Sequence, residues 1–353
     1  MKHYDTIGLP WRSGLGIDVA DCITAQDVMK KAGLDYDVKK CELVAEMPFS
    51  IKGNNLVVET RGEFIHDTKI YRPCPNAYAT YRTDENIPLG IVKEKYEVVQ
   101  NMDAFTFFND AIGEDKALWQ TAGVLGYGER VFVCAKLPIK TSVNGDPIDN
   151  YLVFSNSHDG STSINIMFTP IRVFCTNMLN GALKSADCFI RLRHTKSVKE
   201  KLEFGAKVLA SAIEYAQSAE QLYNSISAIK MTEDNALEFI VKLILSDEEY
   251  YKLINHDAKN GFRKILYRDY RTIEVTEIST KKINQICNMF DYYNNGVAQE
   301  DIKGTAWGVY NGVTGYYSNV VNLGGQKRFD SLLYGGANRT MSKALNDLVA
   351  LAA

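Results

Sequence analysis

Two kinds of hydrophobic spacing divide the chain near Lys196. Between about residue 37 and residue 195, apolar residues stand in short runs or at alternate positions, which is the spacing of β-strands. Beyond Lys196 they recur at three- and four-residue steps, which is the spacing of amphipathic helices. We therefore expect an α+β fold, with an antiparallel β-sheet core flanked by helices and a mainly helical C-terminal region. The expected domains are residues 1–196 and 197–353.

Short turns rich in Gly, Asn and Asp separate two pairs of predicted strands. The first hairpin pairs residues 121–125 with 130–136 across Gly126 to Glu129. The second pairs residues 151–155 with 161–168 across Asn156 to Gly160. Apolar runs joined by such turns are typical of neighbouring antiparallel strands.

Capping residues and spacing mark the predicted helices. Thr24 is a suitable N-cap and Gly33 a suitable C-terminal stop for a short helix, and Asn101 is placed to cap a helix over residues 102–112. One long helix is expected to begin at Ser197. The other predicted helices cover residues 175–183, 232–245, 275–293, 301–310 and 341–351.

Composition is that of an ordinary globular protein. The 353 residues are 46% hydrophobic and 24% charged, and the formal net charge is −3. These values exclude a disordered chain and a globally basic polymer binder, but they permit a local basic face. The 7 cysteines include no Cys-x-x-Cys pair, and no apolar run is long enough for a signal peptide or a membrane span. We expect a cytoplasmic protein with reduced thiols and no membrane partner.

The motifs of common enzyme classes are missing from the sequence. It contains no phosphate-binding loop, no His-Glu-x-x-His and no Gly-x-Ser-x-Gly, and its 5 histidines are too scattered to predict a metal cluster. We therefore expect a protein that is not an enzyme and needs no cofactor or metal. His158 and Asp159 are interpreted as residues of an exposed hairpin turn. An enzyme built around His158, Asp159 and Asn177 is kept as an alternative.

Two basic stretches interrupt this slightly acidic chain. Seven cations and three carboxylates lie between Lys184 and Lys207, where Arg191 and Arg193 share one face of an extended segment. The stretch from Lys259 to Arg271 alternates basic and aromatic residues. Cations that meet phosphates and rings that meet bases are typical of single-stranded nucleic-acid binding. A solvated helix face with its aromatic residues in the core is the alternative for each stretch.

Several segments, in order along nearly the whole chain, carry a resemblance to a known family. They are Gly14-Leu15-Gly16, Ala32-Gly33-Leu34-Asp35-Tyr36, Leu89-Gly90-Ile91-Val92-Lys93, Ser155-Asn156-Ser157-His158-Asp159-Gly160, Thr169-Pro170-Ile171-Arg172 and Gly304-Thr305-Ala306-Trp307-Gly308. In these segments the chain resembles the phage and plasmid-like proteins of domain-of-unknown-function family 932. That family supplies no activity to carry over. The order of elements from Met102 to Leu183 also resembles single-strand annealing proteins of the RecT and Redβ type.

Together, the two resemblances and the basic stretches lead us to expect a protein of a phage or mobile element that binds or anneals single-stranded DNA in recombination without ATP, as a homo-oligomer. Tyr127 would stack on a base. The expected phosphate contacts are Arg130, Lys136, Arg172, Arg191, Arg193 and Lys196. The alternative is an anti-defence protein of the antirestriction type, which would act by contact with a host or phage protein.

Overall fold

The structure is a computed structural model. It describes residues 16–47, 51–52, 55–56, 64–66, 69–112, 118–172, 189–202, 211–256, 261–267 and 277–352.

A six-stranded antiparallel sheet forms the centre of the molecule, in the order β1-β8-β9-β10-β11-β12. Both predicted hairpins are confirmed, because Leu125 pairs with Arg130 and Ser155 with Asn165. Gly128 in the first turn has a φ of 119°, which disfavours any residue with a Cβ. The strands are β1 (Ile17–Asp18), β8 (Leu118–Leu125), β9 (Arg130–Val143), β10 (Asp146–Ser157), β11 (Ile164–Arg172) and β12 (Phe189–Leu192).

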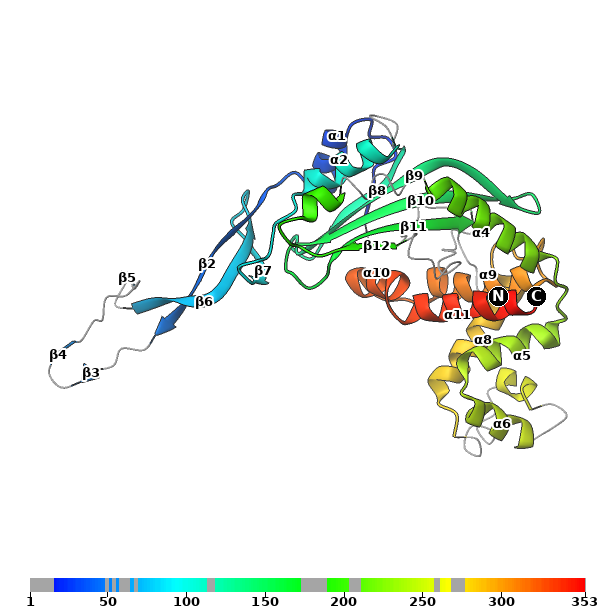
Figure 1. The fold of residues 1–353 in the computed structure, drawn as a ribbon. Coiled ribbons are helices and arrows are strands. Elements are labelled where there is room, and N and C mark those ends of the chain that lie inside the picture. The colour runs from blue at the N-terminus through cyan, green and yellow to red at the C-terminus, as the bar shows by residue number, and fades with distance from the viewer. Residues whose placement is uncertain are drawn as a thin grey trace.

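Helices cover both faces of this sheet (Figure 1). Successive residues of a strand point to opposite faces, so Val133 packs with α1 (Ala25–Ala32) and α2 (Asn101–Ile112). Cys134 belongs to the cluster formed with α4 (Ser211–Ser227), α9 (Ala306–Gly315) and α11 (Gly336–Ala350). Burial on both faces explains why β11 is buried throughout its length.

The remaining helices continue the C-terminal region, which is mainly helical as predicted. They are α5 (Glu233–Ile244), α6 (Asp247–His256), the 3-10 helix Arg263–Tyr267, α8 (Thr280–Asn295), the π-helix Tyr316–Val320 and α10 (Gly325–Leu333). The cluster that contains Cys134 joins strand residues before Lys196 to helix residues after it, so one core spans the predicted domain boundary. The predicted long helix is described over residues 198–202 and 211–227, and the predicted helix 175–183 lies outside the described residues.

The short helix α1 has the caps that its sequence predicts. The Thr24 hydroxyl accepts from the Asp27 backbone N–H, the Asp27 carboxylate accepts from the Thr24 backbone, and Gly33 ends the helix in the left-handed conformation. Every cysteine in the described part is a free thiol. In that same part, no helix has the length and apolar character needed to cross a membrane.

A ribbon of strands projects from the body as an arm (Figure 1). We use "the arm" for β2 (Val38–Met47) and the part of β6 (Lys69–Arg82) that pairs with it. The short strands β3 (Ile51–Lys52), β4 (Asn55–Leu56) and β5 (Phe64–His66) lie toward its tip. β7 (Pro88–Val92) pairs with β6 and leads the chain back to the sheet.

Candidate functional site

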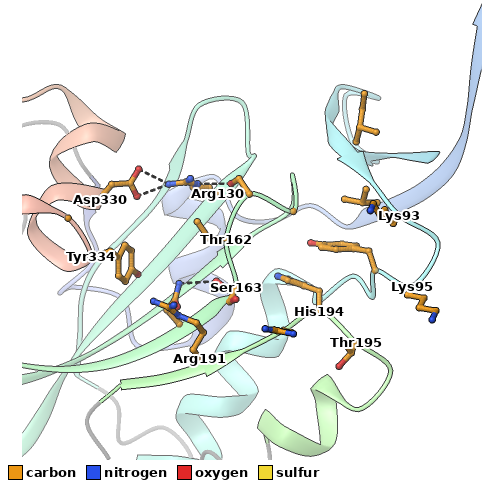
Figure 2. A pocket seen from close by; sticks show the side chains of 18 residues that line it. Lys93, Lys95, Arg130, Thr162, Ser163, Arg191, His194, Thr195, Asp330 and Tyr334 are labelled. Atoms are coloured by element: carbon orange, nitrogen blue, oxygen red, sulfur yellow. Dashed lines mark hydrogen bonds and ion pairs between the residues drawn. The ribbon is translucent and has the colours of Figure 1, made fainter. Parts of the chain in front are cut away.

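A cavity of about 910 Å³ opens where three distant parts of the chain meet. Its walls come from the end of β7 and the loop after it, the β10–β11 turn with the end of β12, and α10 with the residues that follow it (Figure 2). Pockets that bind small molecules are commonly about 300 to 1,000 Å³, so this one is large enough to enclose a ligand. We call it the basic pocket because lysine and arginine side chains are among the residues that line it.

The β10–β11 turn shapes one wall through hydrogen bonds to Asp159. Its carboxylate accepts from the Ser157 hydroxyl at 2.7 Å and from the Ser161 backbone N–H at 2.9 Å. Burial raises the pKa of Asp159, but the hydrogen bonds from Ser161 and Ser157 outweigh burial and hold that pKa below its usual value. β7 lies against this turn so closely that a Cβ on Gly90 would stand 2.5 Å from the Asp159 Cα.

His158 lies in a turn, as predicted, but the expectation that it is exposed is wrong. Its side chain is 0% exposed, and Nε2 lies 2.9 Å from Asn101 Oδ1 on α2. Its backbone N–H donates to Glu129, and its carbonyl accepts from the Thr80 hydroxyl. Burial lowers the pKa of His158 to about 3, so the ring is neutral near pH 7. These contacts give His158 a structural role in the protein interior, and it is not among the residues that line the basic pocket.

Arg130 fastens the C-terminal helices to this wall. Its guanidinium donates to both oxygens of Asp330 on α10, at 2.6 and 2.8 Å, and its Nε donates to Ser161 (Figure 2). Tyr334 follows Asp330 by four residues, and its hydroxyl forms a hydrogen bond with the Ser155 hydroxyl, with 2.8 Å between the two oxygens. Burial raises the pKa of Tyr334 to about 12. The charge of Arg130 is therefore largely balanced within the protein.

Four further cations line the basic pocket. Arg191 and Arg193 are exposed on either side of buried Leu192, which confirms that they share one face. Lys93 and Lys95 are exposed on the loop that faces them (Figure 2). Among the described residues that line the pocket, Asp330 is the one acid. The pocket therefore carries a net positive charge in a chain whose overall charge is negative.

The other predicted phosphate contacts lie away from this pocket. Lys136 is paired with Asp149 at 2.6 Å, and Lys196 is exposed beyond the lining residues. Arg172 needs correction, because it is 1% exposed, is paired with Asp146 and donates to the Ala298 carbonyl. This buried ion pair keeps the Arg172 guanidinium inside the protein, where it cannot contact a nucleic-acid strand at the surface.

Tyr127 and the second basic stretch also lie outside the pocket. Tyr127 is 69% exposed in the β8–β9 turn. In the second stretch, Phe262 packs against the core and Arg263 pairs with Asp234, which favours the alternative interpretation for that part. Asn177 and residues 268–276 lie outside the described residues.

Sequence reasoning missed the lysines and the C-terminal wall. Lys93 and Lys95 flank a glutamate directly after an apolar strand, a signal that a search for longer basic runs passes over. Asp330 and Tyr334 come from the far end of the chain, and no local pattern relates them to Arg130. Among the described residues, no group of three His, Cys, Asp or Glu side chains is placed to hold a metal.

Comparison with known proteins gives one match. Residues 88–345 match the family described as a domain of unknown function (DUF932), which confirms the resemblance drawn from the sequence. No curated protein and no solved structure matches the chain. The matched range covers well over half of the chain and contains every residue that lines the basic pocket. The chain belongs to the DUF932 family.

Proposed function

We propose that this protein binds single-stranded nucleic acid at the basic pocket without using ATP, and that single-stranded DNA of a phage or mobile element is its substrate. The observation that carries the proposal is the group of four exposed cations that line one cavity, where the one acid among the described lining residues is paired with Arg130. An excess of cations over acids around a concave site attracts phosphates.

The neighbouring groups suit a phosphate backbone as well. Ser161, Thr162 and Ser163 line the pocket and carry hydroxyls beside the cations. Hydroxyls and arginine side chains are common donors to phosphate oxygens. A concave site also favours a single strand, because a duplex keeps its bases stacked inside whereas a single strand can turn a base toward the protein.

Annealing is the activity we propose to follow from this binding. Holding two complementary strands in register needs positioned cations and several subunits, and it needs no acid, base, metal or nucleotide hydrolysis. The missing phosphate-binding loop is consistent with this mode of action. An annealing assay with two complementary labelled strands, in which added protein speeds duplex formation, tests this step separately from binding.

A charge-removal experiment tests binding. We expect Arg191→Gln/Arg193→Gln to weaken binding of a labelled single strand, measured by fluorescence anisotropy at several salt concentrations. Each lost phosphate contact makes the slope of log affinity against log salt shallower by about 0.7, so the double variant should change it by about 1.4. Lys30→Gln/Lys281→Gln is the matched control, because both lysines are exposed and neither lines the pocket. Equal slopes for the two double variants would contradict the proposal.

The arm favours a second candidate, contact with a host or phage protein in an anti-defence role. None of the described residues 39–47 belongs to the hydrophobic core, and a ribbon of two strands is barely stable alone. Glu42 pairs with Tyr78, so a short Asn-Gly turn can replace residues 43–77. We expect this deletion to keep nucleic-acid binding. If it also removes protection against restriction in cells while the fold persists, the second function is supported.

A further inference from the structure

Asp330, the one acid among the described residues that line the basic pocket, is bonded to one of the pocket cations. The Nη1 nitrogen of Arg130 donates to both oxygens of this carboxylate, at 2.6 and 2.8 Å (Figure 2). Carboxylates and phosphates present the same kind of charged oxygen to a guanidinium, and arginine binds both. Asp330 therefore occupies Arg130 in the way that a phosphate of a ligand would.

A second contact of Arg130 holds its guanidinium in place without the help of Asp330. The Nε nitrogen donates to the Ser161 hydroxyl at 3.2 Å. Ser161 is itself fixed in the β10–β11 turn, because its backbone N–H and its hydroxyl both donate to Asp159. Arg130 would therefore keep its position in the pocket wall if the carboxylate of Asp330 left it.

The side chain of Asp330 can turn away from Arg130 at little cost. It is 40% exposed within the ion pair, and ion pairs that water reaches contribute little to stability because water solvates each partner after they separate. The helix α10 need not move, since Leu332 and Leu333 near its end are buried in the core and Tyr334 is bonded to Ser155. Rotation of one side chain is enough to uncover the guanidinium.

The other pocket cations give a nucleic-acid strand an advantage over Asp330. The four exposed lysines and arginines that line the pocket attract the phosphates of a strand. Once one phosphate is held, the next is tethered beside Arg130 at a high effective concentration. A phosphodiester carries one negative charge, as a carboxylate does, so the exchange leaves Arg130 paired and releases Asp330 to water.

We propose that Asp330 holds the place of a phosphate in the basic pocket, and that a bound strand displaces it from Arg130, which then becomes a fifth cation in contact with the strand. This inference rests on the proposed nucleic-acid binding and adds a contact and an autoinhibitory carboxylate to it. Because Asp330 competes with the strand for Arg130, it lowers the affinity of the pocket. Two consequences can be measured separately: the ion pair breaks on binding, and removal of Asp330 strengthens binding.

Neutralising the ion pair as a unit tests whether the strand breaks it. Arg130→Gln/Asp330→Asn removes both charges and keeps the net charge of the protein. If Arg130 contacts a phosphate, this variant binds a labelled single strand more weakly, and its slope of log affinity against log salt is shallower by about 0.7. Lys136→Gln/Asp149→Asn is the matched control, because it neutralises an ion pair outside the pocket. An ion pair that stays intact in the complex would leave both double variants with the unaltered slope, which would overturn the inference.

Asp330→Asn alone tests the competition. It keeps Arg130 and removes the competing charge, so affinity for the strand should rise by about twofold to fivefold, the range that a partly exposed ion pair supplies. Asp347→Asn corrects for net charge, because Asp347 is an exposed acid outside the pocket that is paired with Lys343. Equal gains in the two variants, or no gain for Asp330→Asn, would overturn this inference and leave the proposed function in place. Failure of both the unaltered protein and Asp330→Asn to bind a strand would overturn both.

Discussion

The buried ring of His158 predicts that mild acid destabilises the folded protein. In the unfolded chain its pKa is about 6.5, and in the folded chain burial lowers that pKa to about 3. The unfolded chain therefore binds the proton more tightly, so unfolding becomes more favourable as the pH falls below 6.5 and continues to do so down to about 3. Well above pH 6.5 the ring is neutral in both states and His158 causes no change.

The size of the effect follows from the two pKa values. One proton taken up on unfolding changes the free energy by about 1.36 kcal/mol for each pH unit. Between pH 6.5 and about pH 5, His158 should therefore remove about 2 kcal/mol of stability, a substantial part of a typical 5 to 15 kcal/mol. His194 and Asp159 are the titratable groups whose charges act on His158, and neighbouring His194 lowers its pKa further while Asp159 opposes this.

Urea denaturation at several pH values measures this loss. The range from about 7 to about 5 lies above the titration of ordinary carboxylates, so it reports mainly histidines. His158→Gln keeps a donor for Asn101 and removes the titrating ring, so its stability should depend less on pH than that of the unaltered protein. At pH 7 the same variant should be less stable by about 1 to 3 kcal/mol, because a buried, fitted side chain is replaced. A flat profile for the unaltered protein, or the same slope in the variant, would refute the reasoning.

Three other measurements check separate parts of the structure. Gly90→Ala should lower the melting temperature and cost about 1 to 3 kcal/mol, because its new Cβ would overlap the backbone of Asp159. Arg172→Met should cost about 3 to 5 kcal/mol in chemical denaturation, because it leaves the Asp146 carboxylate buried without its cation. Light scattering with and without a single-stranded oligonucleotide should detect self-association, and a strict monomer in both conditions would contradict annealing.

The parts of the fold that local chemistry determines were predictable from the sequence. The two hairpins follow from apolar runs joined by turns such as Gly126 to Glu129, and α1 follows from its caps at Thr24 and Gly33. In each case the residues that decide the structure are near neighbours in the chain. The change of spacing near Lys196 likewise indicated where strands give way to helices.

The burial of particular polar residues was not predictable, because distant segments cause it. His158 is covered by α2 through Asn101 and by β6 through Thr80, and neither contact leaves a mark in the turn sequence itself. Arg172 was expected to contact phosphate because its neighbours in the sequence include no partner for its charge. Its partner, Asp146, begins the neighbouring strand, and only the strand register brings the two residues together. Exposure of a charged residue is thus a property of the assembled sheet.

The residues that the family model matches indicate which part of the chain carries a function common to the family. The matched range, residues 88–345, contains all the residues that line the basic pocket, whereas the arm precedes it. The link between Arg130 and Asp330 makes the pocket depend on both the sheet and the C-terminal helices, so neither part alone would retain its walls. We therefore expect that a function common to the family requires the pocket. A function that requires the arm should instead be restricted to this chain and its nearer relatives.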